Sequence, residues 1–192
     1  MNDLKNLTVS DINEDLVYDN IGNMYLIKDA EAREKFSEIQ ENITDALATT
    51  LVSVFDSLDP VRNIAYEVNR ASNGNKHASK GQAWGAIQHT DYVGGGLKFV
   101  SCSGHGGFLI SDARNAGIPE QLRREDGMYE EDCDFMIIGL VYPENVSDLL
   151  NKWNPEIEDK YTPEKVRAMA AKSVANWHTT AARELIQDFY NR

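Results

Sequence analysis

The sequence is poor in cysteine and has no long apolar run. Only Cys102 and Cys133 are present in 192 residues, and neither has a second thiol at CxxC spacing. This excludes a disulfide framework and indicates a reducing compartment. The longest apolar run, FMIIGLVY, is far too short to span a bilayer, and the polar, acidic start MNDLKNLTVSDINEDL is unlike a signal peptide. We therefore expect a cytosolic protein that does not associate with membranes.

Basic residues are also few. Nineteen Lys and Arg stand against thirty-one Asp and Glu, which gives a net charge of -12. Such a chain repels nucleic-acid duplexes and anionic membranes unless its basic residues are segregated, so we expect no direct nucleic-acid binding. The charge suits a soluble protein, a binder of basic partners or a DNA mimic. The acids are spread along the chain, which disfavours the mimic.

Length and composition predict one compact domain with a helical extension. Hydrophobic residues make up 42% and charged residues 26%, as in globular proteins. We expect residues 1–80 to form a mostly helical N-terminal extension and residues 81–192 to form an α+β domain. Within the extension, residues 15–28 resemble a small hairpin, two β-rich runs around a turn-prone Asn-Ile-Gly-Asn.

A long amphipathic helix is expected after Asp29, which suits the N-cap position. Apolar residues recur there at helical spacing, namely Phe36, Ile39, Ile43, Leu47, Leu51, Val54 and Leu58. The stretch 30–58 is therefore a candidate for homodimer formation. Pro60 is expected to end or kink this helix and to open a second one. The polar run 72–82 then predicts a linker, in which His77 is expected to be an ordinary surface residue.

After the linker the pattern becomes that of β-structure. Apolar runs between residues 83 and 111 are separated by GGG and GHGG, which predicts a three-stranded antiparallel meander with glycines at the connections. Ser111 is expected to cap a short helix that Pro119 closes. The sequence thus predicts a small antiparallel sheet packed by helices.

The apolar run 135–142 suits either a buried strand or a buried helix. The acids before it favour the helix, because carboxylates stabilise the N-terminal end of a helix dipole. Thr162 and Pro163 are expected to open a final helix as N-cap and first residue. Its predicted apolar stripe consists of Val166, Met169, Ala170, Val174 and Trp177.

The stretch SGHGGF, residues 103–108, is unusual because it surrounds one of only four histidines with glycines. A hairpin turn would explain it, and so would a ligand pocket built from glycine amides and the start of the next helix. No Walker or GxGxxG motif is present, so phosphate binding is weakly indicated. The candidate ligand-binding residues in this part are Ser103, His105, Gly106, Gly107, Ser111 and Arg114.

An acidic run is the second candidate. Glu130, Glu131, Asp132 and Asp134 surround Cys133 and repel one another unless cations or solvent intervene. One interpretation is a solvated helix start. The other is a site that receives a positive group, a metal ion or the arginines of a partner, with Glu130, Glu131 and Asp132 as ligand-binding residues.

Cys133 and His105 also suggest an enzyme. A thiol at a helix start can form a nucleophile pair with a histidine, and glycine amides can act as oxyanion donors. The flanking carboxylates oppose this, because they raise the thiol pKa unless an arginine such as Arg114, Arg123 or Arg124 is near. A half-buried structural cysteine is the alternative.

Zinc is considered because Cys102 and His105 are three residues apart, with Cys133 and Asp132 available to complete four ligands. Structural zinc sites normally use paired, closely spaced ligands, and the second pair is absent here. We therefore expect no metal and no cofactor.

Several segments together resemble a known family. They are Trp84-Gly85, residues 96–119, residues 128–144 and the ANWH stretch 175–178. They are similar to a domain of unknown function from bacteriophage and plasmid proteins, with S-H-G-G-F, then L-S-x-x-R, a proline, and W-[FY]-E-E-D-C-E-W. The chain departs from this pattern at Gly104, Met128, Asp134 and Phe135, and a serine hydroxyl is lost at Gly104. The resemblance covers about residues 84–178.

The resemblance implies a phage or mobile-element protein in the host bacterial cytoplasm, with no established reaction. It also implies that the histidine loop and the acidic run form one shared site or one structural clasp. We expect a non-catalytic accessory protein that binds a host protein or a small host metabolite, in counter-defence or host takeover. A Cys133/His105 hydrolase or transferase and an acidic DNA mimic are the alternatives.

Overall fold

The structure is a computed structural model, and it divides the chain into two compact units, Met1–Ala46 and Leu47–Arg192. The expected boundary between residues 80 and 81 stays a prediction. The backbone is described for residues 8–10, 13–18, 24–26, 30–73 and 84–191, and side chains for residues 34, 35, 37–59 and 84–191.

The first unit contains a small antiparallel sheet. Strand β2 (Asn13–Tyr18) pairs with β3 (Met24–Leu26), which confirms the hairpin expected within residues 15–28. Strand β1 (Thr8–Ser10) pairs with the other edge of β2 and was not expected. Three residues are too few to produce an alternating pattern that sequence reasoning can detect.

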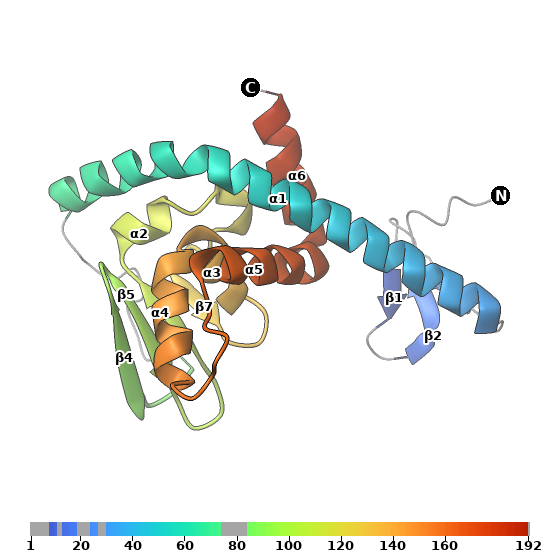
Figure 1. The fold of residues 1–192 in the computed structure, drawn as a ribbon, viewed down its shortest axis with the longest axis horizontal. Helices are drawn as coiled ribbons and strands as arrows, with labels where there is room; N and C mark the ends of the chain where they lie inside the picture. The colour runs from blue at the N-terminus through green and yellow to red at the C-terminus, as the bar shows by residue number, and fades with distance from the viewer. Residues whose placement is uncertain (1–7, 11–12, 19–23, 27–29, 74–83, 192) are drawn as a thin grey trace. The chain divides into compact units, whose positions relative to one another are not determined.

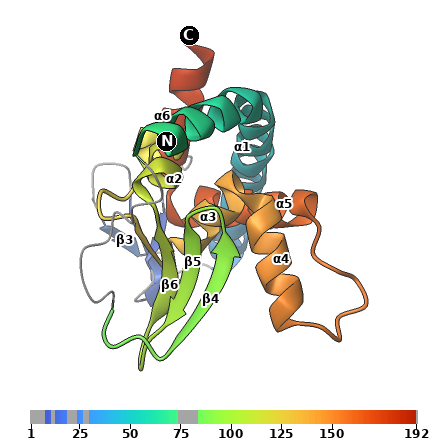
Figure 2. The ribbon, with the colours of Figure 1, turned by 90° about the vertical axis from the view of Figure 1, so that its left-hand side faces the viewer.

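Helix α1 (Ala30–Asn73) is a single helix of 44 residues that continues through Pro60. The expected second helix is therefore its continuation. A proline inside a helix removes one backbone hydrogen bond and kinks the axis, and Figure 2 shows α1 bent rather than ended. Asp29 and most of the expected linker, including His77, lie outside the described residues.

The middle of α1 belongs to the core of the second unit. Leu51, Val54 and Phe55 are completely buried there, although they were expected to belong to an extension. Arg167 adds ion pairs to this helix, with Nη1 2.6 Å from Asp56 Oδ1 and Nη2 2.7 Å from Asp59 Oδ2. This part of the apolar stripe is thus buried in the core of the same chain. A homodimer through residues 30–58 stays a prediction.

The second unit contains a four-stranded antiparallel sheet of order β4-β5-β6-β7. The expected meander is confirmed in β4 (His89–Gly94), β5 (Leu97–Ser101) and β6 (Gly106–Ile110). The short strand β7 (Met128–Glu130) adds a fourth strand that was not expected.

Helices α3 and α4 pack against this sheet, and α5 packs against these two helices (Figures 1 and 2). The unit's helical segments are α2 (Asp112–Ala116), the 3-10 turn η2 (Glu120–Leu122), α3 (Phe135–Val141), α4 (Pro143–Trp153), α5 (Pro163–Trp177) and α6 (Thr179–Tyr190). None of the helices in the described part of the chain is long and apolar enough to cross a membrane. The fold is α+β, as expected, and the apolar run 135–142 is helical over most of its length.

The predicted caps of two helices are confirmed. Ser111 Oγ accepts a hydrogen bond from the Arg114 amide at α2, and Thr162 Oγ1 accepts one from the Lys165 amide at α5. The helix favoured for residues 135–142 is confirmed as α3, although its N-cap residue Asp134 makes no side-chain capping hydrogen bond. Its carboxylate is used in ion pairs instead.

Aromatic rings fill the core between the sheet and the helices. Phe108 of β6 is completely buried and stacks on Phe135 of α3, with ring centroids 5.1 Å apart. Phe99 of β5 contacts both rings edge to face. Burial of a side chain of this size stabilises a fold by about 2–3 kcal/mol, so this cluster fixes α3 on the sheet.

The predicted stripe of α5 is correct in part. Val166, Ala170 and Val174 are completely buried, whereas Met169 is 44% exposed and Trp177 is 58% exposed. The buried face of α5 also includes Arg167, Ala171 and Ala175, and Met169 lies outside this face. Trp177 is the last residue of the helix and lies beyond the core.

Candidate functional site

The SGHGGF stretch forms the tight connection between β5 and β6. The Cys102 amide donates a 2.7 Å hydrogen bond to the His105 carbonyl, and Ser101 pairs with Gly106 directly after it. Ser103, Gly104 and His105 are therefore exposed at the end of the hairpin. The turn fixes the backbone of His105 and leaves its side chain 57% exposed.

Strand β7 brings the acidic run to the same place. Glu130 pairs with Gly107 across the β6–β7 ladder, and the Glu131 amide donates a 3.0 Å hydrogen bond to the Gly106 carbonyl. His105 Nδ1 lies 3.1 Å from Glu130 Oε1 as a result. The two segments, 25 residues apart in sequence, are thus in contact, as predicted.

Two glycines make this close approach possible. A Cβ added to Gly106 would lie 2.5 Å from Glu131 Oε2 and 2.8 Å from the Val100 carbonyl oxygen. Gly107 has a φ of +152°, and a Cβ there would lie 2.2 Å from the Tyr129 carbonyl oxygen. All three distances are far below van der Waals contact, so only glycine lets β7 and the Glu131 carboxylate lie against this strand.

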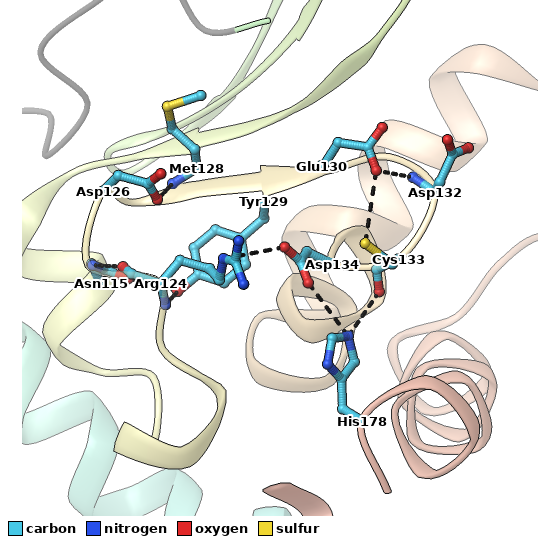
Figure 3. Close-up of polar contacts among 10 residues, drawn as sticks. All are labelled: Asn115, Arg124, Asp126, Met128, Tyr129, Glu130, Asp132, Cys133, Asp134 and His178. Carbon is cyan, nitrogen blue, oxygen red and sulfur yellow. Dashed lines mark hydrogen bonds and ion pairs between the residues drawn. The ribbon is translucent and has the colours of Figure 1, made fainter. Parts of the chain in front are cut away.

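Glu130 is held in its ionised form. Its side chain is only 19% exposed, and burial by itself would raise its pKa. The hydrogen bond from the Asp132 amide and the contact with His105 outweigh burial, so the pKa of Glu130 lies below its usual value. Figure 3 shows the Glu130 carboxylate facing both the Asp132 amide and the Cys133 thiol.

Cys133 is exposed, and its surroundings disfavour the thiolate form. Burial of the sulfur, followed by the charges of Asp134 and Glu130, raises the pKa of Cys133. The Cys133 Sγ and the His105 Nδ1 each contact the Glu130 carboxylate, at 3.8 Å from Oε2 and 3.1 Å from Oε1, and no hydrogen bond joins the thiol to the imidazole. A Cys133/His105 nucleophile pair therefore receives no support from the geometry.

Three residues that were not among the predicted ligand-binding residues, Arg124, Asp134 and His178, lie around the start of α3 (Figure 3). The buried carboxylate of Asp134 lies 3.3 Å from Arg124 Nε and 3.4 Å from His178 Nε2. His178 Nε2 also donates to the Cys133 carbonyl at 3.1 Å. These contacts tie the α5–α6 junction to the acidic run. The ANWH segment, which ends at His178, was the only sequence signal for them.

A buried tyrosine holds the base of β7. The Tyr129 hydroxyl donates to Asn115 Oδ1 at 2.7 Å and accepts from the Arg124 amide at 3.0 Å. Asn115 Nδ2 completes the triangle by donating to the Arg124 carbonyl at 2.7 Å (Figure 3). Burial raises the pKa of Tyr129, so its hydroxyl keeps the proton that this network needs.

Ser111 and Arg114 do not join His105, contrary to the single pocket considered from the sequence. Ser111 directly follows the opposite end of β6, about 20 Å from His105 along a strand that rises about 3.4 Å per residue, and Arg114 belongs to helix α2 beyond it. Ser111 is buried as the cap of α2. Arg114 Nε donates to the Gly95 carbonyl at 2.8 Å, and its guanidinium lies over the Tyr142 ring. Both residues hold the β4–β5 turn in place.

The ligand set considered for zinc does not assemble. Cys102 is buried, and its thiol is directed at the Gly85 carbonyl 3.6 Å away. Among the described residues, a different group lies together: His105, Glu130 and Glu131 each offer a ligand atom, all within 4.8 Å of one another. We call these three residues the β6–β7 cluster.

A family comparison covers this whole region. A family model for a domain of unknown function, DUF7007, matches residues 77–189. The chain belongs to the DUF7007 family. The DUF7007 match contains the β6–β7 cluster, the Asp134 contacts and His178, and it extends the resemblance beyond residues 84–178. No curated protein and no solved structure matches the chain.

Proposed function

We propose that this DUF7007 protein is a non-catalytic binding protein that receives a positively charged group of a host protein, or of a small host metabolite, at the β6–β7 cluster. The observation that carries the proposal is that the adjacent carboxylates of Glu130 and Glu131 lie together beside His105 at the end of the β6–β7 ladder. Within the described part of the chain, no lysine or arginine forms an ion pair with Glu130 or Glu131.

Electrostatics favour this kind of ligand. The carboxyl group of Glu130 is ionised at neutral pH like that of an ordinary glutamate, and its lowered pKa favours this form further; Glu131 and Asp132 add adjacent acidic side chains on an exposed turn. Guanidinium and ammonium groups form strong charge-assisted hydrogen bonds with such carboxylates. A net charge of -12 also increases the rate at which cationic ligands approach.

Two further observations support a role without catalysis. The raised pKa of Cys133 keeps its thiol protonated at neutral pH, and a protonated thiol is a poor nucleophile. His105 Nδ1 is directed at a carboxylate and not at this thiol. The alternative of a Cys/His hydrolase or transferase therefore has no specific observation in its favour.

The biological setting is part of the same proposal. The resemblance of the SGHGGF and EEDC motifs to phage and plasmid proteins supports an accessory protein that acts in the host bacterial cytoplasm, in counter-defence or host takeover. Binding of a basic surface would suit such a role because it blocks a host protein without requiring turnover.

The experiment measures binding of short arginine-rich and lysine-rich peptides, and of spermidine as a small cationic metabolite, by isothermal titration calorimetry. The test variant is Glu130→Gln/Glu131→Gln, and the control is Glu156→Gln/Glu158→Gln, which removes the same charge from an exposed loop outside the cluster. We expect the test variant to lose at least about tenfold in affinity and the control to change little, because exposed charges act weakly at a distance. Equal affinity of both variants, or no binding by the unsubstituted protein, would overturn the proposal.

A further inference from the structure

We infer that the β6–β7 cluster also binds a divalent transition-metal ion, with His105 Nδ1 and one carboxylate oxygen each from Glu130 and Glu131 as protein ligands. This inference deepens the proposed function, because it names a second kind of cation for the same cluster and predicts that the two compete. A metal ion was considered from the sequence at the acidic run, but His105 was not grouped with Glu130 and Glu131 as its ligands, because the spacing of cysteine and histidine directed attention to Cys102 and Cys133 instead.

The distances suit a metal centre. Ligands bound at about 2.0–2.1 Å lie about 3.0 Å apart at right angles and about 3.4 Å apart at the tetrahedral angle. His105 Nδ1 and Glu130 Oε1 are 3.1 Å apart, and all three ligand atoms lie within 4.8 Å of one another. Small rotations of the exposed His105 and Glu131 side chains are enough to bring the three atoms around one ion.

The backbone holds these ligands before any ion binds. His105 follows a tight turn that its own carbonyl closes, and Glu130 is the last residue of a strand that pairs with β6. The Glu131 amide is hydrogen-bonded to Gly106, so its side chain starts from a fixed position. Because the backbone of each ligand is already in place, binding has to restrict only side-chain rotations, which favours affinity.

The ligand types determine which metal is preferred. One imidazole and two carboxylates suit Zn²⁺ or Mn²⁺, whereas Mg²⁺ and Ca²⁺ prefer sites made only of oxygen ligands. The Irving–Williams order then places Zn²⁺ above Mn²⁺ in affinity. Three protein ligands leave at least one coordination position for water or for a group from another molecule.

A second histidine–carboxylate contact in the same sheet provides a matched control. His89 Nε2 lies 3.3 Å from Asp91 Oδ2, a geometry close to that of His105 and Glu130. However, Asp91 already accepts hydrogen bonds from Lys152 Nζ at 2.5 Å and from Trp153 Nε1 at 3.0 Å. Because the Lys152 ammonium already occupies this carboxylate, we expect His89 and Asp91 not to bind a metal ion.

The experiment titrates Zn²⁺, Mn²⁺ and Mg²⁺ separately into the full-length, untagged protein by isothermal titration calorimetry. The variants are His105→Ala, Glu131→Gln, Cys133→Ser and the control His89→Ala, each checked for folding by circular dichroism. We expect one Zn²⁺ per chain, with affinity decreasing in the order Zn²⁺, Mn²⁺, Mg²⁺. His105→Ala and Glu131→Gln should each lower Zn²⁺ affinity by at least about tenfold, while His89→Ala and Cys133→Ser should change it little.

Two results would overturn the inference: the absence of a stoichiometric Zn²⁺ site, or a loss of affinity in His89→Ala or Cys133→Ser equal to that in His105→Ala. Peptide binding distinguishes this failure from that of the proposed function. A basic group needs the carboxylates but not the imidazole, so His105→Ala should retain peptide binding while it loses Zn²⁺. Excess Zn²⁺ should displace the peptide from the unsubstituted protein.

Discussion

The Glu131 carboxylate occupies the space that a side chain on Gly106 would need, with Oε2 2.5 Å from the position of an added Cβ. The Val100 carbonyl oxygen closes the same space at 2.8 Å and belongs to the backbone, so it yields less easily than a side chain. Gly106 is therefore part of the geometry of the β6–β7 cluster, although it supplies no functional atom.

Replacing this glycine should disturb the cluster. We expect Gly106→Ala to lower the free energy of unfolding by about 1–3 kcal/mol, as overpacking does, and to weaken cation binding. Gly104→Ala is the matched control, because nothing lies within 4 Å of a Cβ added there. Urea denaturation and calorimetric titration of both variants measure the two effects. Equal stability of the two variants would show that β6 adjusts without cost.

Arg167 is expected to be important for the packing of α1. Its side chain is only 10% exposed and makes ion pairs with Asp56 and Asp59. Arg167→Met removes the partner of both carboxylates, so the free energy of unfolding should fall by about 2–3 kcal/mol. Arg183→Met, an exposed change on α6, should cost much less. Urea denaturation compares the two, and similar losses would contradict this role.

Asp91 should make stability depend on pH. The hydrogen bonds from Lys152 and then Trp153 hold the pKa of Asp91 below its usual value. The stabilisation is therefore present above the unfolded-state pKa of about 3.9 and is lost as the pH falls through the lower pKa of the folded state. Asp91→Asn should cost about 1–2 kcal/mol at pH 7, and the difference from the unsubstituted protein should shrink in acid. Urea denaturation between pH 2 and 7 measures this.

Asp148→Asn serves as the control for that experiment, because Asp148 is exposed on the same helix as Lys152. Its difference from the unsubstituted protein should be small at every pH. A loss in Asp91→Asn that persists undiminished at the lowest pH would mean that the amide disturbs packing, and that the charge of Asp91 is not responsible.

Cys133 should react slowly with alkylating reagents. Burial and the charges of Asp134 and Glu130 raise its pKa, which lowers the thiolate fraction at neutral pH. In a Cys102→Ser background, iodoacetamide should label Cys133 several-fold more slowly than a free cysteine at the same pH. Glu130→Gln should increase the rate, because it removes one of the charges that raise the pKa. Mass spectrometry over time follows the reaction, and labelling as fast as free cysteine would contradict the expectation.

Local signals predicted much of the fold. The glycine clusters correctly marked the connections of the meander, and Ser111, Thr162 and Pro163 marked helix starts, because capping and turn chemistry depend on a few adjacent residues. At Pro60 the kink is found, whereas the separate second helix is not, and the reason is tertiary. Leu51, Val54 and Phe55 are completely buried in the turns of α1 that precede Pro60. Burial of this kind overrides the local preference of proline to end a helix.

The candidate site was predictable in part. The resemblance linked His105 to the acidic run, and the contact between His105 and Glu130 confirms that link. The separation of Ser111 and Arg114 from His105 was missed, because residues that are close in the sequence were assigned to one pocket. Strand β6 lies between them, and its length places them apart. His178 reaches Asp134 only through the packing of α5 on α3, which no local pattern encodes.

The burial of α1 in the second unit has a practical consequence for recombinant work. A fragment trimmed to residues 77–189, the range of the family match, would lack Leu51 and Phe55, which are completely buried in the core. Such a fragment would expose an apolar seam and would be prone to aggregate. Expression boundaries should therefore begin upstream of Leu47, even when only the region matched by the family is of interest.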